Sequence, residues 1–148
     1  MFRVQPISAA QAPAIIEIQQ LLYLYAYALD SRSYALLEEI FTPDAHLEMS
    51  SGVAMSPTQY RAMCERVLPT LAATQHVTTN VLVDVDGDRG RARAYYHAQH
   101  CREGLPEGNL LMMGGWVDDE VVLVDGRWRI SSRRWNSVWS EGNAAVLG

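Results

Sequence analysis

Two Asp-Gly dipeptides in the C-terminal half, Asp86-Gly87 and Asp125-Gly126, constrain the fold more than any other feature of this sequence. Each lies between two β-rich runs, where Asp-Gly favours the tight turn of a hairpin because both residues tolerate a positive φ. The runs around them cover about residues 72–85, 90–102, 109–124 and 127–138, and a shorter run covers 45–50. The pattern therefore predicts an antiparallel meander.

The N-terminal half is helical. Within residues 14–29, apolar side chains recur at spacings of three and four, at Ile15, Ile18, Leu22, Tyr25 and Leu29. Pro13 suits the first turn of this helix. We expect a short second helix within 30–41, with candidate N-caps at Asp30, Ser31 and Ser33, and a third helix within 56–69. Helices followed by an antiparallel sheet predict an α+β domain whose sheet curls around the helices and leaves room for a ligand.

Composition narrows the classes of function. The 148 residues suit one domain, 49% hydrophobic and 20% charged, and the net charge of −5 without a basic cluster argues against a nucleic-acid partner. Cys64 and Cys101 fit neither a zinc spacing nor a disulfide framework, so we expect both to be reduced. The start lacks the pattern of a signal peptide, and Glu17 and two glutamines interrupt the apolar run 14–29. These features predict a cytoplasmic protein that does not bind membranes.

Alternation along the strands predicts which side chains face inward. One face of strand 72–85 carries Thr74, His76, Thr78 and Asn80. One face of strand 90–102 lacks arginine and is expected to be buried; it carries Ala92, Ala94, Tyr96, Ala98 and His100. Arg91, Arg93, Tyr95 and His97 then face outward. Gly114 and Gly115 inside the next strand predict a bulge or a close approach to the backbone.

Four stretches carry a resemblance to a known family: "IQQLLYLYAYALD" from Ile18 to Asp30, "FTPDAHLEM", "TQHVTTN" and "GGWVDDEVVLVDGRW". Together they resemble the SnoaL-like, nuclear-transport-factor-2-like superfamily, most closely the branch of scytalone dehydratase, bile-acid 7α-dehydratase and hexachlorocyclohexane dehydrochlorinase. The resemblance implies a single α+β domain over residues 1–148, a cone-shaped roll or barrel (cystatin-like). Its N-terminal helices would pack in the concave face of a curved, mixed, mostly antiparallel sheet.

The same resemblance implies a site. Those enzymes pair a helix aspartate with a strand histidine, and the matching positions are Asp30 and His76; Tyr25 and His100 match further site residues. An aspartate that accepts the Nδ1 proton of a histidine fixes the tautomer and leaves Nε2 as a base. We expect Asp30 to orient, His76 to abstract a proton from carbon, and Tyr25 and His100 to assist, in an elimination or isomerisation that needs no cofactor. The substrate would be a small hydrophobic, cyclic molecule.

Other residues are expected to line the pocket of this substrate. They are Leu22, Met49, Tyr96, Met113, Gly115, Val117 and Trp135. Relatives of this branch have polar side chains that bind their substrates at four positions where this sequence has Tyr25, Met49, Val117 and Val124. The resemblance therefore implies the Asp30–His76 pair but not the relatives' substrates.

Each site residue has an alternative interpretation. Asp30 could cap the second helix, His76 could be a satisfied core histidine, His100 a wall residue and Tyr25 a core residue. The alternative function is a ligand-binding module or a small β-subunit of a ring-hydroxylating dioxygenase. No ligand spacing for a metal is present, and none is expected. Relatives of this branch usually form trimers through the outer sheet face, so we expect a homo-oligomer, with a trimer ahead of a dimer.

Overall fold

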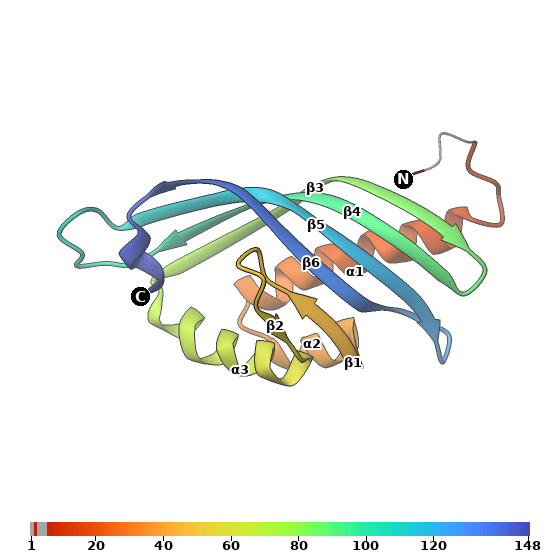
Figure 1. The fold of residues 1–148 in the computed structure, drawn as a ribbon, viewed down its shortest axis with the longest axis horizontal. Helices are drawn as coiled ribbons and strands as arrows, with labels where there is room; N and C mark the ends of the chain where they lie inside the picture. Colours follow the sequence, from red (N-terminus) through yellow and green to blue (C-terminus); the bar gives the residue numbers. More distant parts are fainter. Residues whose placement is uncertain (1, 3–5) are drawn as a thin grey trace.

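The computed structural model describes residue 2 and residues 6–148. Part of the N-terminal segment on which the signal-peptide prediction rests therefore lies outside the described residues. Figure 1 shows a curved sheet as one layer, with the helices gathered on its concave side. No described helix combines the length and the apolarity needed to cross a membrane.

Three α-helices precede the long strands. They are α1 (Ala12–Asp30), α2 (Leu37–Ile40) and α3 (Pro57–Val67), with short 3₁₀ turns at η1 (Tyr34–Leu36) and η2 (Leu68–Thr70); a third 3₁₀ turn, η3 (Ala144–Leu147), follows the last strand. Pro13 lies in the first turn of α1, as predicted. Ser56 and Gln59 close a capping box that fixes the start of α3. The predicted second helix is shorter than 30–41, and no side-chain hydrogen bond caps η1 or α2, so Asp30 is not their cap.

The strands form one mixed sheet. They are β1 (Phe41–Glu48), β2 (Ala54–Met55), β3 (Ala73–Asp86), β4 (Arg89–Cys101), β5 (Leu110–Val124) and β6 (Arg127–Gly142), in the spatial order β2-β1-β6-β5-β4-β3. Among the strand pairs of the described residues, β1–β6 is parallel and the others are antiparallel. The α+β class is confirmed, but the sheet is not closed into a barrel. Its two edge strands, β2 and β3, are not paired with each other.

Both predicted hairpins are present. Asp125 and Gly126 have φ of 50° and 75°, the pair of positive values that a type I′ turn requires. The β3–β4 loop is centred one residue later than predicted, on Gly87 and Asp88.

A bulge changes the face that part of β3 presents. Register shifts between Thr79 and Leu82, where Asn80 has a φ of 52°. Thr74, His76 and Thr78 face inward before the bulge, whereas Val83 and Val85 pack on the core after it. Asn80 is exposed, so the prediction that it shares a face with His76 is wrong.

The predicted bulge at Gly114 and Gly115 is confirmed by a register shift between them. A Cβ on Gly115 would overlap the backbone carbonyl of Asn136, and one on Gly114 would overlap the indole of Trp139. Gly115 pairs with Tyr96 of β4 on one side and with Ser137 of β6 on the other, and the Tyr96 and Ser137 hydroxyls are hydrogen-bonded across it. The missing side chain at Gly115 thus lets the Tyr96 ring cross β5.

Candidate active site

A cavity of about 520 Å³ lies between the helices and the inner face of the sheet. Its wall includes six of the seven residues that the sequence predicted around a substrate: Leu22, Met49, Tyr96, Met113, Val117 and Trp135. The seventh, Gly115, is not among the lining residues, and the backbone carbonyl of Asn136 occupies the place that a side chain on Gly115 would take. The remaining wall is mostly apolar. Apart from hydroxyl groups such as those of Ser50 and Ser137, its polar side chains lie at two places.

The first place is the end of α1, where Asp30 meets β3. The Nδ1–H of His76 donates to Oδ1 of Asp30 at 2.7 Å, and the backbone N–H of His76 donates to Oδ2 at 2.8 Å. The hydroxyl of Thr74 donates to the same Oδ1 at 3.0 Å. The predicted Asp30–His76 contact is therefore confirmed, and the helix-cap alternative for Asp30 is wrong. With Nδ1 bound to Asp30, Nε2 is the ring nitrogen that a ligand in the cavity can meet.

The carboxylate of Asp30 is held in its charged form. Burial alone would raise its pKa, but the hydrogen bonds from the His76 ring and backbone, together with that from Thr74, lower the pKa below its usual value. Because an ionised carboxylate can only accept hydrogen bonds, Nδ1 of His76 must carry the proton.

His100 lies beside His76 in the cavity wall, with the two rings perpendicular and their centroids 5.6 Å apart. Burial and the neighbouring His76 lower the pKa of His100, so the ring is neutral near pH 7. Its Nδ1 has no hydrogen-bond partner among the described residues. As predicted, His97 faces away from the cavity; it is exposed and packs against Trp139.

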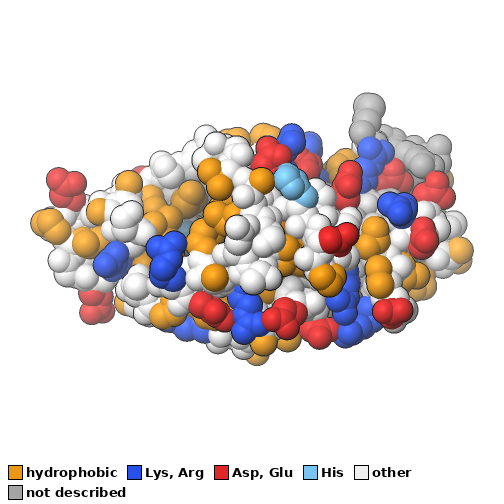
Figure 2. Space-filling model, turned by 60° about the horizontal axis from the view of Figure 1, so that its bottom comes forward, with side chains coloured by type: hydrophobic (Ala, Val, Ile, Leu, Met, Phe, Trp, Pro, Cys, Tyr) orange, Lys and Arg blue, Asp and Glu red, His pale blue; other side chains and the backbone are white. Residues whose placement is uncertain are grey.

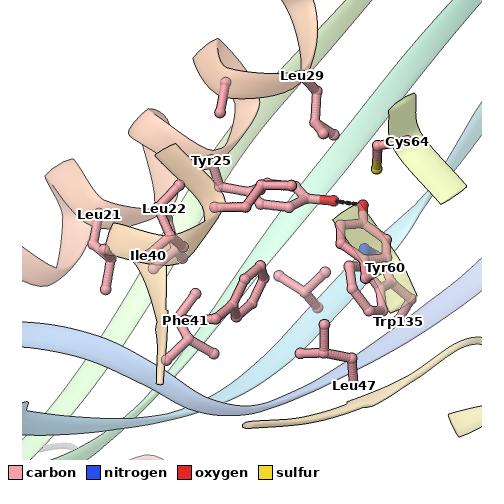
Figure 3. Close-up of a cluster of buried hydrophobic side chains, with 14 of the residues drawn as sticks. Leu21, Leu22, Tyr25, Leu29, Ile40, Phe41, Leu47, Tyr60, Cys64 and Trp135 are labelled. Atoms are coloured by element: carbon pink, nitrogen blue, oxygen red, sulfur yellow. Dashed lines mark hydrogen bonds between the residues drawn. The ribbon is translucent and has the colours of Figure 1, made fainter. Parts of the chain in front are cut away.

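The second polar place lies deeper and was not predicted, apart from Tyr25. The hydroxyl groups of Tyr25 on α1 and Tyr60 on α3 are hydrogen-bonded to each other (Figure 3). The guanidinium of Arg133 on β6 lies 4.2 Å from the centroid of the Tyr25 ring. Asp119 on β5 binds Arg133 in a bidentate pair, with Nε–Oδ1 and Nη2–Oδ2 distances of 2.7 Å each.

This deeper cluster is almost entirely buried. The side chains of Arg133 and Asp119 are 1% and 0% exposed. Burial raises the pKa of Tyr25 to about 12 although the Arg133 charge opposes this, and burial raises that of Tyr60 as well. Burial alone would lower the pKa of Arg133, but Asp119 raises it, so the guanidinium stays charged.

A sequence signal for the deeper cluster exists. The pairing of β5 with β6 contains a further bulge, where Glu120 pairs with Ser132 and Val121 with Ile130. It reverses the alternation of β6 and turns Arg133 inward. Before the bulge the buried large apolar residues of β6, Trp128 and Ile130, have even numbers, whereas after it the buried Trp135 has an odd number. This change of parity in the large apolar residues indicates the bulge. Tyr60 begins a buried stripe at spacings of four with Cys64 and Leu68.

Neither cysteine forms a disulfide: Cys64 is buried, and Cys101 is partly exposed. Within the described part of the chain, no group of three His, Cys, Asp or Glu side chains is placed to hold a metal ion.

Comparison with known proteins identifies relatives. The sequence profile of the SnoaL-like domain matches residues 10–134. An uncharacterized protein of Mycobacterium tuberculosis is 31% identical over 129 residues, which cover 86% of this chain and 87% of the relative.

Two solved structures share the fold. The crystal structure of a proposed scytalone dehydratase from Novosphingobium aromaticivorans has a TM-score of 0.83 at 19% identity and covers 93% of this chain and 92% of its own. A hexachlorocyclohexane dehydrochlorinase has a TM-score of 0.78 at 20% identity and covers 90% and 91%. At these identities the likeness concerns the fold.

Proposed function

The chain belongs to the SnoaL-like family, and we propose that it is a lyase or isomerase that takes a proton from carbon in a small hydrophobic, cyclic molecule. The observation that carries this proposal is the Asp30–His76 hydrogen bond at the wall of a largely apolar cavity. The names of two structures with the same fold, a dehydrochlorinase and a proposed dehydratase, support an elimination.

In the proposed step, Nε2 of His76 takes the proton and becomes part of an imidazolium, which the Asp30 carboxylate stabilises. The electron pair of the broken C–H bond stays on the substrate, either as an enolate or by expelling a leaving group from the next carbon. Tyr25 donates a hydrogen bond to the oxygen that gains charge. His100 is held neutral, so it assists the leaving group through its N–H and not as a ground-state cation.

A screen of cyclic hydroxy-ketones and halides tests this proposal. Once a substrate is found, His76→Ala should abolish turnover, and Asp30→Asn should lower kcat about 10²- to 10⁴-fold, because only the tautomer and the charge are lost. His97→Ala is the matched control, since His97 lies outside the cavity, and it should leave turnover unchanged. If both site variants bind ligand normally and no substrate emerges, the protein is a binding module.

We also propose that the protein is a homo-oligomer, a trimer ahead of a dimer, that associates through the outer face of the sheet. Large hydrophobic side chains on this face are 41–50% exposed: Val77, Tyr95 and Trp139. Elsewhere the surface is mixed, and Figure 2 shows acidic and basic side chains interleaved on the face it presents. Light scattering at micromolar concentration should give a multiple of 16.6 kDa, and the mass of one chain would contradict the proposal. Tyr95→Glu should shift the oligomer toward monomer.

A further inference from the structure

A pair of hydroxyl groups in the cavity wall takes no part in the proposed chemistry. The hydroxyls of Tyr96 on β4 and Ser137 on β6 are hydrogen-bonded to each other, and both residues line the cavity. Their strands are separated by β5, which runs between them (Figure 1). Gly115, the residue of β5 that pairs with both, has no side chain to keep them apart.

Ser50 fixes the position of this hydroxyl pair. Its hydroxyl donates to the backbone carbonyl of Trp135 at 3.0 Å and accepts from the backbone N–H of Ser137 at 2.7 Å. Ser137 is thereby held twice, at its backbone by Ser50 and at its side chain by Tyr96. Polar groups that are held in place before a ligand arrives lose little entropy on binding, as a preformed site requires.

The hydroxyl pair has one proton to spare. Burial raises the pKa of Tyr96, so its hydroxyl is protonated at neutral pH. The two hydroxyls therefore carry two protons, and their mutual hydrogen bond uses one of them. Both oxygens also keep lone pairs. The pair thus offers the cavity one hydrogen-bond donor and at least one acceptor.

This combination selects the group that the pair can bind. A carbonyl or ether oxygen accepts a hydrogen bond but donates none, so the acceptor of the pair would stay unused. A carboxylate or phosphate would leave water for two uncharged hydroxyls, which is costly. A ligand hydroxyl accepts the spare proton and donates its own to the pair, so it satisfies both groups.

The hydroxyl pair lies across the cavity from the proposed base. Tyr96 is two residues along β4 from Ala98, the partner of His76, which is about 7 Å along the strands. The ring of Tyr96 crosses β5, which places its hydroxyl about two strand spacings from β3, or about 10 Å. The separation is then roughly 12 Å, and contacts of about 3 Å at each end leave roughly 6 Å within the ligand. A fused bicycle with a hydroxyl on its far ring has this length.

We propose that the Tyr96–Ser137 hydroxyl pair is a specificity site, which binds a hydroxyl group on the substrate ring remote from the C–H bond that His76 breaks. This assignment rests on the proposed function, because it describes the substrate of His76. It narrows that substrate from a hydrophobic cyclic molecule to a fused-ring alcohol or phenol. The pair binds this molecule and does not take part in the proton transfer.

Calorimetry with three ketones of one ring system tests the site without turnover. The wild type should bind 6-hydroxy-2-tetralone about 3- to 10-fold more tightly than 2-tetralone, the gain expected of one net hydrogen bond. The methyl ether, 6-methoxy-2-tetralone, should lack this gain because its oxygen has no proton to donate. The double variant Tyr96→Phe/Ser137→Ala should bind the hydroxy ketone and 2-tetralone equally. It should fold, because replacing both partners of a hydrogen bond by apolar groups of the same shape is nearly neutral.

The matched control is Tyr34→Phe/Ser131→Ala, which makes the same two chemical changes away from the cavity. The Tyr34 hydroxyl is buried without a partner among the described residues, and the Ser131 hydroxyl on β6 donates to the backbone carbonyl of Glu120. Neither residue lines the cavity, so the control should keep the preference for the hydroxy ketone.

Four results would overturn the proposal. They are equal wild-type affinities for the hydroxy ketone and 2-tetralone, binding of none of the three ketones, a methyl ether bound as tightly as the hydroxy ketone, and a preference that survives in Tyr96→Phe/Ser137→Ala or is lost in the control. The comparison of the three ketones uses the wild type alone, so it decides the matter even if the double variant does not fold.

A second readout separates the specificity site from the proposed function. Exchange of the α-protons of 6-hydroxy-2-tetralone in D₂O above the buffer rate should vanish in His76→Ala. Preferred binding of the hydroxy ketone without any exchange by the wild type would support the site and contradict the base. Exchange that depends on His76, with equal binding of the hydroxy ketone and 2-tetralone, would do the reverse.

Discussion

At one end of the cavity the side chains of Asp30 and His76 keep 27% and 14% of their exposure, whereas at the other Asp119 and Arg133 keep 0% and 1%. Both pairs are hydrogen-bonded at 2.7 Å, so geometry alone does not distinguish them. The first pair contains an imidazole, a side chain that can act as a base, whereas the Arg133 guanidinium of the second pair remains charged. The comparison teaches that the first pair is suited to move a proton, and the second to hold a fixed arrangement of donors.

Depth of burial should also decide how much the free energy of unfolding falls when one partner of an ion pair is removed. A buried ion pair that loses one partner leaves an uncompensated charge, which costs far more than an exposed pair. Asp118 and Asp119 offer this comparison at neighbouring positions of β5. Asp119 binds Arg133 in the core, and Asp118 binds the half-exposed Arg93 at 2.6 Å.

The largest effect on stability is expected from Asp119→Ala. It should lower the free energy of unfolding by about 3–5 kcal/mol, because Arg133 is left buried without a counter-charge. Urea unfolding followed by circular dichroism measures this loss. Asp118→Ala, the matched control, should cost about 1 kcal/mol or less. Equal losses for the two variants would show that the core pair and the surface pair are energetically alike.

A smaller effect on the free energy of unfolding is expected at the Asp30–His76 end of the cavity when the pH is lowered. The pKa of His100 is lowered in the folded protein, so the unfolded chain binds more protons once the pH falls below about 6.5. The free energy of unfolding should therefore decline from pH 7 to pH 5, and His100→Gln should make this decline shallower. Urea midpoints at pH 5, 6 and 7 measure it, with His97→Gln as the control for loss of an imidazole. A decline as steep in His100→Gln as in the wild type would remove His100 as its source.

The sequence predicted the end of the cavity at which the local pattern is uninterrupted. Thr74, His76 and Thr78 alternate without a bulge, and α1 runs unbroken to Asp30, so both sides of the pair could be placed from spacing and resemblance. The deeper end depends on the bulge in β6, beyond which Arg133 faces the core. A one-residue shift of this kind reverses every later side chain, and a charged residue gives no sign that it is buried until its partner is known.

The same limit explains two smaller errors. The bulge at Asn80 reversed the second half of β3, and the one at Gly114 and Gly115 removed Gly115 from the cavity wall. The sequence shows an asparagine at the first bulge and two glycines at the second. Which side chains then change face depends on which residue of the neighbouring strand is left unpaired. That choice is made by tertiary packing, which strand periodicity does not contain.

The central claim is that Asp30 fixes His76 in the tautomer that presents a basic Nε2 to the cavity. Ring ¹⁵N NMR of the protein, which has four histidines, tests it most directly, with His76→Gln used to assign the signal. In the wild type at neutral pH, Nδ1 of His76 should carry the proton and Nε2 should have the shift of an unprotonated nitrogen. Asp30→Asn should abolish this preference. A wild-type signal with the proton on Nε2, or a tautomer unchanged in Asp30→Asn, would contradict the account.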